Sequence, residues 1–126
     1  MIVVDTSVLI EALGAGGSLR TAFRSTLADG YRVALPTLVL YEWLRGPRLA
    51  EELDLQEAIL PASEALPFGP AEARTAAELF RALGRARGRE IDLAIAACAI
   101  AWSGSLWTLN TDDFGDVPGL ELWIGG

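Results

Sequence analysis

Short runs typical of β-strands alternate along this chain with longer segments whose apolar residues recur at helical spacing. The candidate strands cover 2–4, 32–35, 106–109 and 120–124. Helices are expected directly after 5–7 and over 19–27, 36–45, 48–59, 70–87 and 90–102, with a short extended segment at 65–68. Strands that alternate with helices favour a parallel sheet with helices on both faces. The length of 126 residues is that of one domain.

The residue types that are missing restrict the possible chemistry. The chain has no His, which excludes Ser-His-Asp and Cys-His catalysis and His-ligated zinc. All 10 basic residues are Arg, which excludes Schiff-base chemistry and the P-loop lysine. Cys98 is the one Cys and can form no internal disulfide, which suits a reducing cytoplasm. Carboxylates must therefore do most of the work of any enzyme built on this chain.

No membrane span and no signal peptide are expected. The uncharged stretch 93–111 is broken at 103–105 and Asn110 after about ten apolar residues, whereas a spanning helix needs ~20. Asp5 and Glu11 interrupt the apolar N-terminal segment before it reaches the length of a signal sequence. We therefore expect a cytoplasmic protein.

Acidic residues follow two of the predicted strands. Asp5 comes directly after 2–4, and Asp112 and Asp113 follow 106–109. In open parallel sheets the ligand crevice lies outside the carboxyl ends of the strands, so these acids would share one edge if the two strands are neighbours. Each of these acids also has a purely structural alternative. Asp5 could simply cap the following helix, and the Asp pair could simply form a polar turn.

Two further acids lie inside otherwise apolar helices. Glu42 and Asp92 occupy positions where an unpaired carboxylate is costly. A structural role is possible for each, because Glu42 can pair with Arg45 and Asp92 lies in a first helical turn, where the helix dipole stabilises an anion. Clustered carboxylates repel one another and need a cation to stay ionised together. Oxygen ligands without imidazole select Mg²⁺ or Mn²⁺ over zinc.

Four stretches of sequence, in this order, carry a resemblance to a known family. They are VVDTSVLI at 3–10, YEWLRG at 41–46, EIDLAIAA at 90–97, and TLNTDDF at 108–114 with VPGL at 117–120. With these motifs the chain resembles PIN-domain proteins, and closely the VapC toxin ribonucleases of type II toxin–antitoxin systems. The stretches span nearly the whole chain, and four in order are far more specific than any one alone.

The resemblance implies an α/β fold in which 1–126 form a single PIN-like domain. The expected architecture is a three-layer sandwich with a central, mostly parallel sheet flanked by helices. Residue by residue, the acids that would hold Mg²⁺ or Mn²⁺ fall on Asp5, Glu42, Asp92 and Asp113. Asp112 is the adjacent alternative for the fourth acid. The polar residues expected around these acids or against substrate are Thr6, Arg45, Thr108, Asn110 and Asp112.

The function implied by the resemblance is that of a metal-dependent endoribonuclease, the toxin of a VapBC-type pair. A metal-activated water would attack the scissile phosphate in line. Because the 2′-hydroxyl of the RNA is not needed, the products would carry 5′-phosphate and 3′-hydroxyl ends. The implied partners are an RNA substrate, a cognate VapB-type antitoxin whose tail lies over the active site, and a second copy of the chain in a homodimer.

Aromatic and basic residues add expectations about these partners. The 4 Trp residues are more than a core of this size readily buries, so a partner should cover some aromatic surface. Tyr41 and Trp43 flank Glu42 and could stack on unpaired bases, although at least one is expected in the core. The net charge of −7 gives no general attraction to RNA. Local positive charge could come from Arg45, Arg48, Arg81, Arg85, Arg87 and Arg89, with solvated helix faces as the alternative.

Two other classes of protein compete with the nuclease. A phosphorylation-receiver domain also places acids around Mg²⁺ at strand ends, but it needs paired acids after the first strand and a Lys. Here Asp5 is followed by Thr6 and Ser7, and the chain has no Lys. A protein that keeps the PIN fold only to bind a partner, as a scaffold without catalysis, is the second alternative. Metal-dependent RNA cleavage by the purified chain would separate these possibilities.

Overall fold

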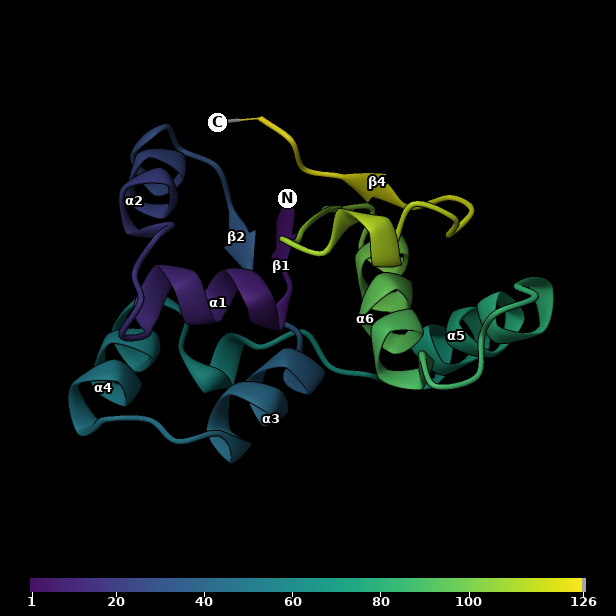
Figure 1. Ribbon diagram of the computed structural model, residues 1–126, viewed down its shortest axis with the longest axis horizontal. Helices are drawn as coiled ribbons and strands as arrows, with labels where there is room; N and C mark the ends of the chain where they lie inside the picture. The colour runs from purple at the N-terminus through teal and green to yellow at the C-terminus, as the bar shows by residue number, and fades with distance from the viewer. Residues whose placement is uncertain (126) are drawn as a thin grey trace.

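The computed structural model describes residues 1–125 and has a four-stranded parallel sheet at its centre (Figure 1). The strands are β1 (Ile2–Val4), β2 (Val33–Ala34), β3 (Ser105–Trp107) and β4 (Glu121–Leu122), in the order β2-β1-β3-β4. All three neighbouring pairs are parallel. The predicted α/β fold class, a parallel sheet flanked by helices, is therefore confirmed.

Across these residues, six α-helices and two short 3-10 helices connect the strands. They are α1 (Thr6–Leu13), α2 (Arg20–Ala28), α3 (Thr37–Arg45), α4 (Ala50–Ile59), η1 (Ala62–Glu64), α5 (Pro70–Ala82), α6 (Glu90–Ala101) and η2 (Thr111–Asp113). Figure 1 shows α1, α2, α3 and α4 grouped at one end of the molecule and α5 and α6 at the other. In the part of the chain described, no helix combines the length and apolar character needed to cross a membrane.

Strand β1 lies between β2 and β3, so the first strand of the chain pairs with one that comes about 100 residues later. Ile2 pairs with Val33 of β2 on one side and with Ser105 of β3 on the other. The ladder between β1 and β3 ends with Val4 opposite Trp107. Whatever follows these two residues therefore lies at the same edge of the sheet.

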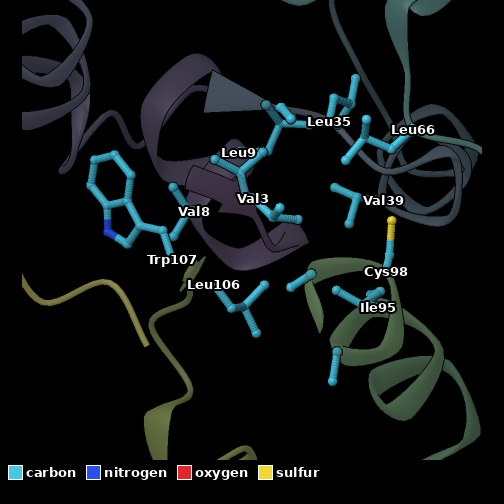
Figure 2. Packing of buried hydrophobic residues seen from close by; sticks show 14 of the residues in the cluster. Val3, Val8, Leu9, Leu35, Val39, Leu66, Ile95, Cys98, Leu106 and Trp107 are labelled. Atoms are coloured by element: carbon cyan, nitrogen blue, oxygen red, sulfur yellow. The ribbon is translucent and has the colours of Figure 1, made fainter. Parts of the chain in front are cut away.

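The core lies between the sheet and the helices (Figure 2). The side chains of Val3 and Leu106, from neighbouring strands, pack with Val39 of α3 and Ile95 of α6. Helix α6 is buried at seven consecutive positions, 93–99. The sequence of 90–102 is apolar nearly all round, which predicts a helix packed on more than one side, and this burial confirms it.

Helix α5 differs from its prediction in length and in its buried face. It begins at Pro70 as expected, where the fixed φ of Pro suits a first helical position. It ends at Ala82, short of the predicted stop at Gly88, because Leu83 is extended, with φ −94° and ψ 132°, and two turns follow at 84–85 and 87–88. Its apolar residues recur at helical spacing, which predicts that Ala73, Ala77 and Phe80 face inward, but these three are exposed and Leu79 is the buried residue. Since α5 packs chiefly against α6, only one side of it is covered.

Two further boundaries differ by a few residues. Strand β3 ends at Trp107, two residues before its predicted end, because Thr108 turns its hydroxyl to Asp5 and the chain leaves the sheet. Helix α4 begins at Ala50 rather than at Arg48. The Arg48 side chain instead folds back, and its Nε donates a 2.8 Å hydrogen bond to the carbonyl of Trp43.

Candidate functional site

Asp5 follows β1 directly and is buried, with 4% of its surface exposed. Its Oδ1 accepts a 2.8 Å hydrogen bond from the backbone N–H of Thr6 and so caps α1. Its Oδ2 accepts hydrogen bonds from Thr108 Oγ1 at 2.7 Å and from Ser7 Oγ at 3.2 Å. Within residues 1–125 no Arg pairs with it. The Asp5 carboxylate therefore caps helix α1 from a position directly after strand β1.

Thr108 and Ser7 link the end of β3 to the start of α1. Thr108 Oγ1 accepts a 3.0 Å hydrogen bond from the backbone N–H of Asn110, and Ser7 Oγ accepts one of 3.1 Å from that of Leu109. These bonds fix the turn after β3 beside Asp5. Ser7 is not among the predicted site residues, and its place two residues after the capping acid was the available signal.

Glu42 projects from the middle of α3 towards α1. Its Oε1 accepts a 2.5 Å hydrogen bond from Thr6 Oγ1. Its Oε2 lies 3.4 Å from Arg45 Nη2, an ion pair in which the Arg45 side chain is 57% exposed. A pair of that length in solvent contributes little, so the ion pair does not account for the position of Glu42. The hydrogen bond from Thr6, the residue after Asp5, instead links Glu42 to the segment that carries Asp5.

Asp92 lies in the first turn of α6, where its carboxylate is partly buried. Burial raises the pKa of Asp92, and the negative charges of Asp5, Asp113 and Glu42 raise it further, in that order, while Arg89 opposes them. None of residues 1–125 forms a hydrogen bond or an ion pair with this carboxylate that the structure records. The four predicted acids therefore form one electrostatic cluster around Asp92.

The two adjacent acids of η2 are not equivalent. Asp113 is among the charges that raise the pKa of Asp92 most, and Asp112 is not. Both side chains are exposed. Asp113 thus lies on the side of η2 that faces α6, and Asp112 lies further from the cluster.

Arg89, immediately before α6, ties that helix to the segment after η2. Its Nη1 and Nη2 donate hydrogen bonds of 3.0 and 2.7 Å to the two carboxylate oxygens of Asp116. Nη2 also donates a 2.8 Å hydrogen bond to the carbonyl of Asp113. The contact with Arg89 lowers the pKa of Asp116. Asp116 was not predicted as part of the site, because a contact between two loops leaves no periodic signal in the sequence.

The two aromatic residues that flank Glu42 have different surroundings. Trp43 is fully buried, and the Arg48 guanidinium lies 4.2 Å from its ring centroid. Tyr41 is 55% exposed, with the Arg45 guanidinium 5.2 Å from its ring centroid. This division confirms that one of the pair packs in the core. Only Tyr41 is left to contact a partner.

The donors of the cluster match a hard cation in chemical type. All four are carboxylates, and the structure places no compensating cation on Asp5 or Asp92 within residues 1–125. Oxygen donors of this kind are those of Mg²⁺ and Mn²⁺. As the described side chains stand, no three His, Cys, Asp or Glu residues are gathered closely enough to hold a metal ion together. The acids therefore fit Mg²⁺ or Mn²⁺ in the chemical type of their donor atoms and in the negative charge that they share.

Comparison with known proteins agrees with this architecture. The model of the PIN domain family matches residues 2–120. A chain of the crystal structure of VapBC2 from Rickettsia felis, bound to a DNA fragment from its promoter, has a TM-score of 0.76 and 25% identity, with 98% of each chain covered. A chain of DNA-bound VapBC from Salmonella typhimurium has a TM-score of 0.77 and 21% identity, with 97% and 96% covered. For VapBC-5 from Mycobacterium tuberculosis the values are 0.62 and 27%, with 95% and 94% covered. Comparison with curated proteins gave no match.

Proposed function

The chain belongs to the PIN domain family, and from this premise we propose that it is a metal-dependent endoribonuclease, the toxin of a VapBC-type toxin–antitoxin pair. One observation supports the proposal above the others. Asp5, Glu42, Asp92 and Asp113 come from four separate parts of the chain, yet the charges of the other three all act on Asp92. PIN domains of VapC toxins are generally nucleases, so this cluster is the natural place for catalysis.

Mg²⁺ or Mn²⁺ would be held by these four carboxylates. When bound, such an ion lowers the pKa of a water and neutralises charge that develops on the phosphoryl oxygens. The acids are suited to this role because, among the described residues, neither Asp5 nor Asp92 forms an ion pair. Of the two candidates for the fourth acid, we assign Asp113, whose charge acts on Asp92.

The surrounding residues fix the acids in place. Thr108 and Ser7 hold one oxygen of Asp5, and the backbone of Thr6 holds the other. The Thr6 hydroxyl orients Glu42. Arg89 holds the carbonyl of Asp113 and so sets the distance between η2 and α6. A site whose ligands are held before substrate arrives needs less reorganisation during the reaction.

The proposed substrate is single-stranded or looped RNA. Proteins recognise RNA sequence largely through unpaired bases that stack on aromatic or Arg side chains. Tyr41 supplies an exposed ring one residue before Glu42, and Arg45 lies over that ring. A base stacked at Tyr41 would place its neighbouring phosphate towards the acids.

An antitoxin partner is supported by the structural neighbours, which come from VapBC and FitAB complexes. On this chain, an apolar hollow of about 450 Å³ lies on the face of α3 lined by Thr37, Leu40, Tyr41, Leu44 and Arg45. Leu44 is 53% exposed there. We propose that an apolar segment of the antitoxin occupies this hollow and covers the acids.

We also propose a homodimer. Two of the four Trp residues, Trp43 and Trp107, are buried. Trp102 is 42% exposed and is the Trp residue that a partner could cover. Stronger support comes from α5, whose outward side presents Phe80, 41% exposed, among exposed Ala residues. A second copy of α5 would cover this side.

The test of the proposed function is RNA cleavage by the purified chain. We expect cleavage that needs Mg²⁺ or Mn²⁺, stops with a chelator and leaves 5′-phosphate ends. Asp92→Asn should fold and lose activity by orders of magnitude, since each 1.36 kcal/mol of lost transition-state stabilisation is tenfold in rate. Expressed without antitoxin, the wild type should arrest growth and Asp92→Asn should not. If Asp92→Asn folds, binds metal normally and still arrests growth, the catalytic assignment is wrong.

A PIN-fold scaffold without catalysis is the alternative, and the same experiment decides it. A scaffold would bind its partner with or without the acids, and neither metal nor Asp92→Asn would change the RNA. The retention of all four acids in one cluster favours the enzyme.

A further inference from the structure

A second hollow, which is polar and has a volume of about 370 Å³, adjoins the acids on the side of η2. The loop between α5 and α6 forms one wall, and the segment from η2 to Asp116 forms the other. Its lining residues are Gly84, Arg85, Arg87, Arg89, Asp112, Asp113 and Asp116. Asp113 belongs to this lining and to the acid cluster, so the hollow and the proposed catalytic site share a wall.

The three Arg residues of this hollow have different surroundings. Arg89 is fully engaged with Asp116 and with the carbonyl of Asp113. The side chains of Arg85 and Arg87 are exposed and form no hydrogen bond or ion pair within residues 1–125. Arg85 takes part in the fold through its backbone, since its carbonyl accepts a 3.1 Å hydrogen bond from Arg89 Nη1. In the described part of the chain, two guanidinium groups therefore lie beside the acids without a hydrogen bond or ion pair, although the charge of Arg85 acts on Asp116 and that of Arg87 on Glu90.

The positive charge at this place stands out because it lies next to the acid cluster, with Asp113 in the lining of the same hollow. The formal net charge is −7, which repels a polyanion in general. Arg binds phosphate oxygens through a planar set of donors and is preferred where phosphates are recognised. An RNA strand whose scissile phosphate lies at the acids carries a further phosphate on every nucleotide, and the next ones along the strand need neutralisation.

We propose that Arg85 and Arg87 bind the phosphates of the RNA strand that neighbour the scissile one, and so position the strand across Asp113. This inference rests on the proposed function. Arg89 does not touch RNA in this arrangement, and it acts by holding the two walls together. Asp112 also lines the hollow and forms no ion pair within residues 1–125, so its charge opposes the binding of RNA.

The experiment measures binding, not activity, in the Asp92→Asn background, so that the RNA stays intact. A fluorescein-labelled single-stranded RNA is titrated in Mg²⁺ at several salt concentrations and followed by anisotropy. For Arg85→Ala/Arg87→Ala we expect affinity to fall roughly tenfold or more. The slope of log K against log salt should fall by about 1.4, at about 0.7 for each phosphate that Arg no longer neutralises. Asp112→Asn should strengthen binding.

The matched control is Arg24→Ala/Arg74→Ala, which removes two exposed Arg residues outside the hollow. It should change neither affinity nor slope beyond a general effect of charge. Equal weakening by the two double variants, or no weakening by either, would overturn the proposal. A labelled decaglutamate peptide that binds more tightly than RNA and depends on Arg85 and Arg87 would also overturn it, because the surface would then serve an acidic protein segment.

Calorimetry with Mn²⁺ on Arg85→Ala/Arg87→Ala in an otherwise wild-type chain keeps the two proposals apart. The double variant should bind Mn²⁺ as the wild type does, because neither Arg is a proposed ligand. If no RNA is cleaved by the wild type but RNA binding still depends on these two Arg residues, the nuclease proposal fails and the phosphate site stands.

Discussion

The hydroxyl of Thr108 donates a 2.7 Å hydrogen bond to Oδ2 of Asp5, although the two residues are 103 positions apart in the sequence. Both lie just past the point where the ladder between β1 and β3 ends, and both are buried. The bond therefore extends the pairing of the two strands through side chains. It also fixes the direction of the Asp5 carboxylate, which forms no ion pair in the described part of the chain.

Replacement of Thr108 by Val tests this bond. The change keeps the side-chain shape and removes the donor to Asp5 and the acceptor for the backbone N–H of Asn110. We expect the free energy of unfolding in urea, without metal, to fall by about 1.5–3 kcal/mol, the range for a hydrogen bond to a charged group. Thr111→Val, at an exposed position of η2, is the control and should stay within about 0.5 kcal/mol of wild type. Similar values for the two variants would contradict the role of Thr108.

The pH dependence of stability should report on Asp92. Burial and neighbouring acids raise its pKa in the folded chain, so the folded state binds this proton more tightly than the unfolded state does. The ionised carboxylate is then destabilising above the folded pKa, and that cost disappears as the pH falls through it. Without metal, Asp92→Asn should be at least as stable as wild type at neutral pH, and its advantage should shrink as the solution is acidified. Urea unfolding over a pH series measures this. An advantage that grows on acidification would contradict the raised pKa.

Metal should stabilise the wild type through the acids. A ligand that binds only the folded state adds about 2.7 kcal/mol at one hundred times its dissociation constant. We expect Mn²⁺ to raise the melting temperature of the wild type but not that of Asp5→Asn, which keeps the shape of the side chain and loses its charge. Calorimetry should show the same loss of binding. Equal binding of Mn²⁺ by both proteins would refute the assignment of Asp5 as a ligand.

Association through α5 can be tested at Phe80. Phe80→Asp places a charge on the exposed side of the helix, so light scattering should show a dimer for the wild type and a monomer for the variant. The stability of the monomer should change little, since Phe80 is exposed in a single chain. Leu55→Asp, at an exposed position of α4, is the control and should remain dimeric. A wild type that is monomeric at high concentration would contradict the dimer.

Much of the fold could be predicted because local and global signals agree. The run 2–4 is β-branched and ends at a capping acid, and the almost wholly apolar segment from 90 leaves no polar face for solvent. The location of Asp5 and of the segment after β3 at one edge of the sheet could be predicted on the premise that the two strands are parallel neighbours. The end of α5 was missed because the Leu, Ala and Arg residues after Ala82 favour a helix and Gly88 is the stop that the sequence predicts, whereas the helix gives way to a turn at Gly84.

Other features depend on tertiary contacts that the sequence does not encode locally. The pairing of Arg89 with Asp116 joins two loops, and neither residue lies in a periodic pattern. Adjacent Asp112 and Asp113 have the same chemistry, so only the direction of η2 separates them. Phe80 has the spacing of a core residue, but amphipathic spacing does not tell whether the covering surface belongs to the same chain.

The order of the strands in the sheet also bears on synthesis at the ribosome. Strand β1 is made first, but its neighbour β3 emerges only after α6, so the edge that gathers Asp5 and Asp113 closes late. Pairing between residues so distant in sequence is slow to form. On the proposed function, a nascent chain that lacks β3 and η2 has an incomplete set of acids and leaves intact the message that encodes it.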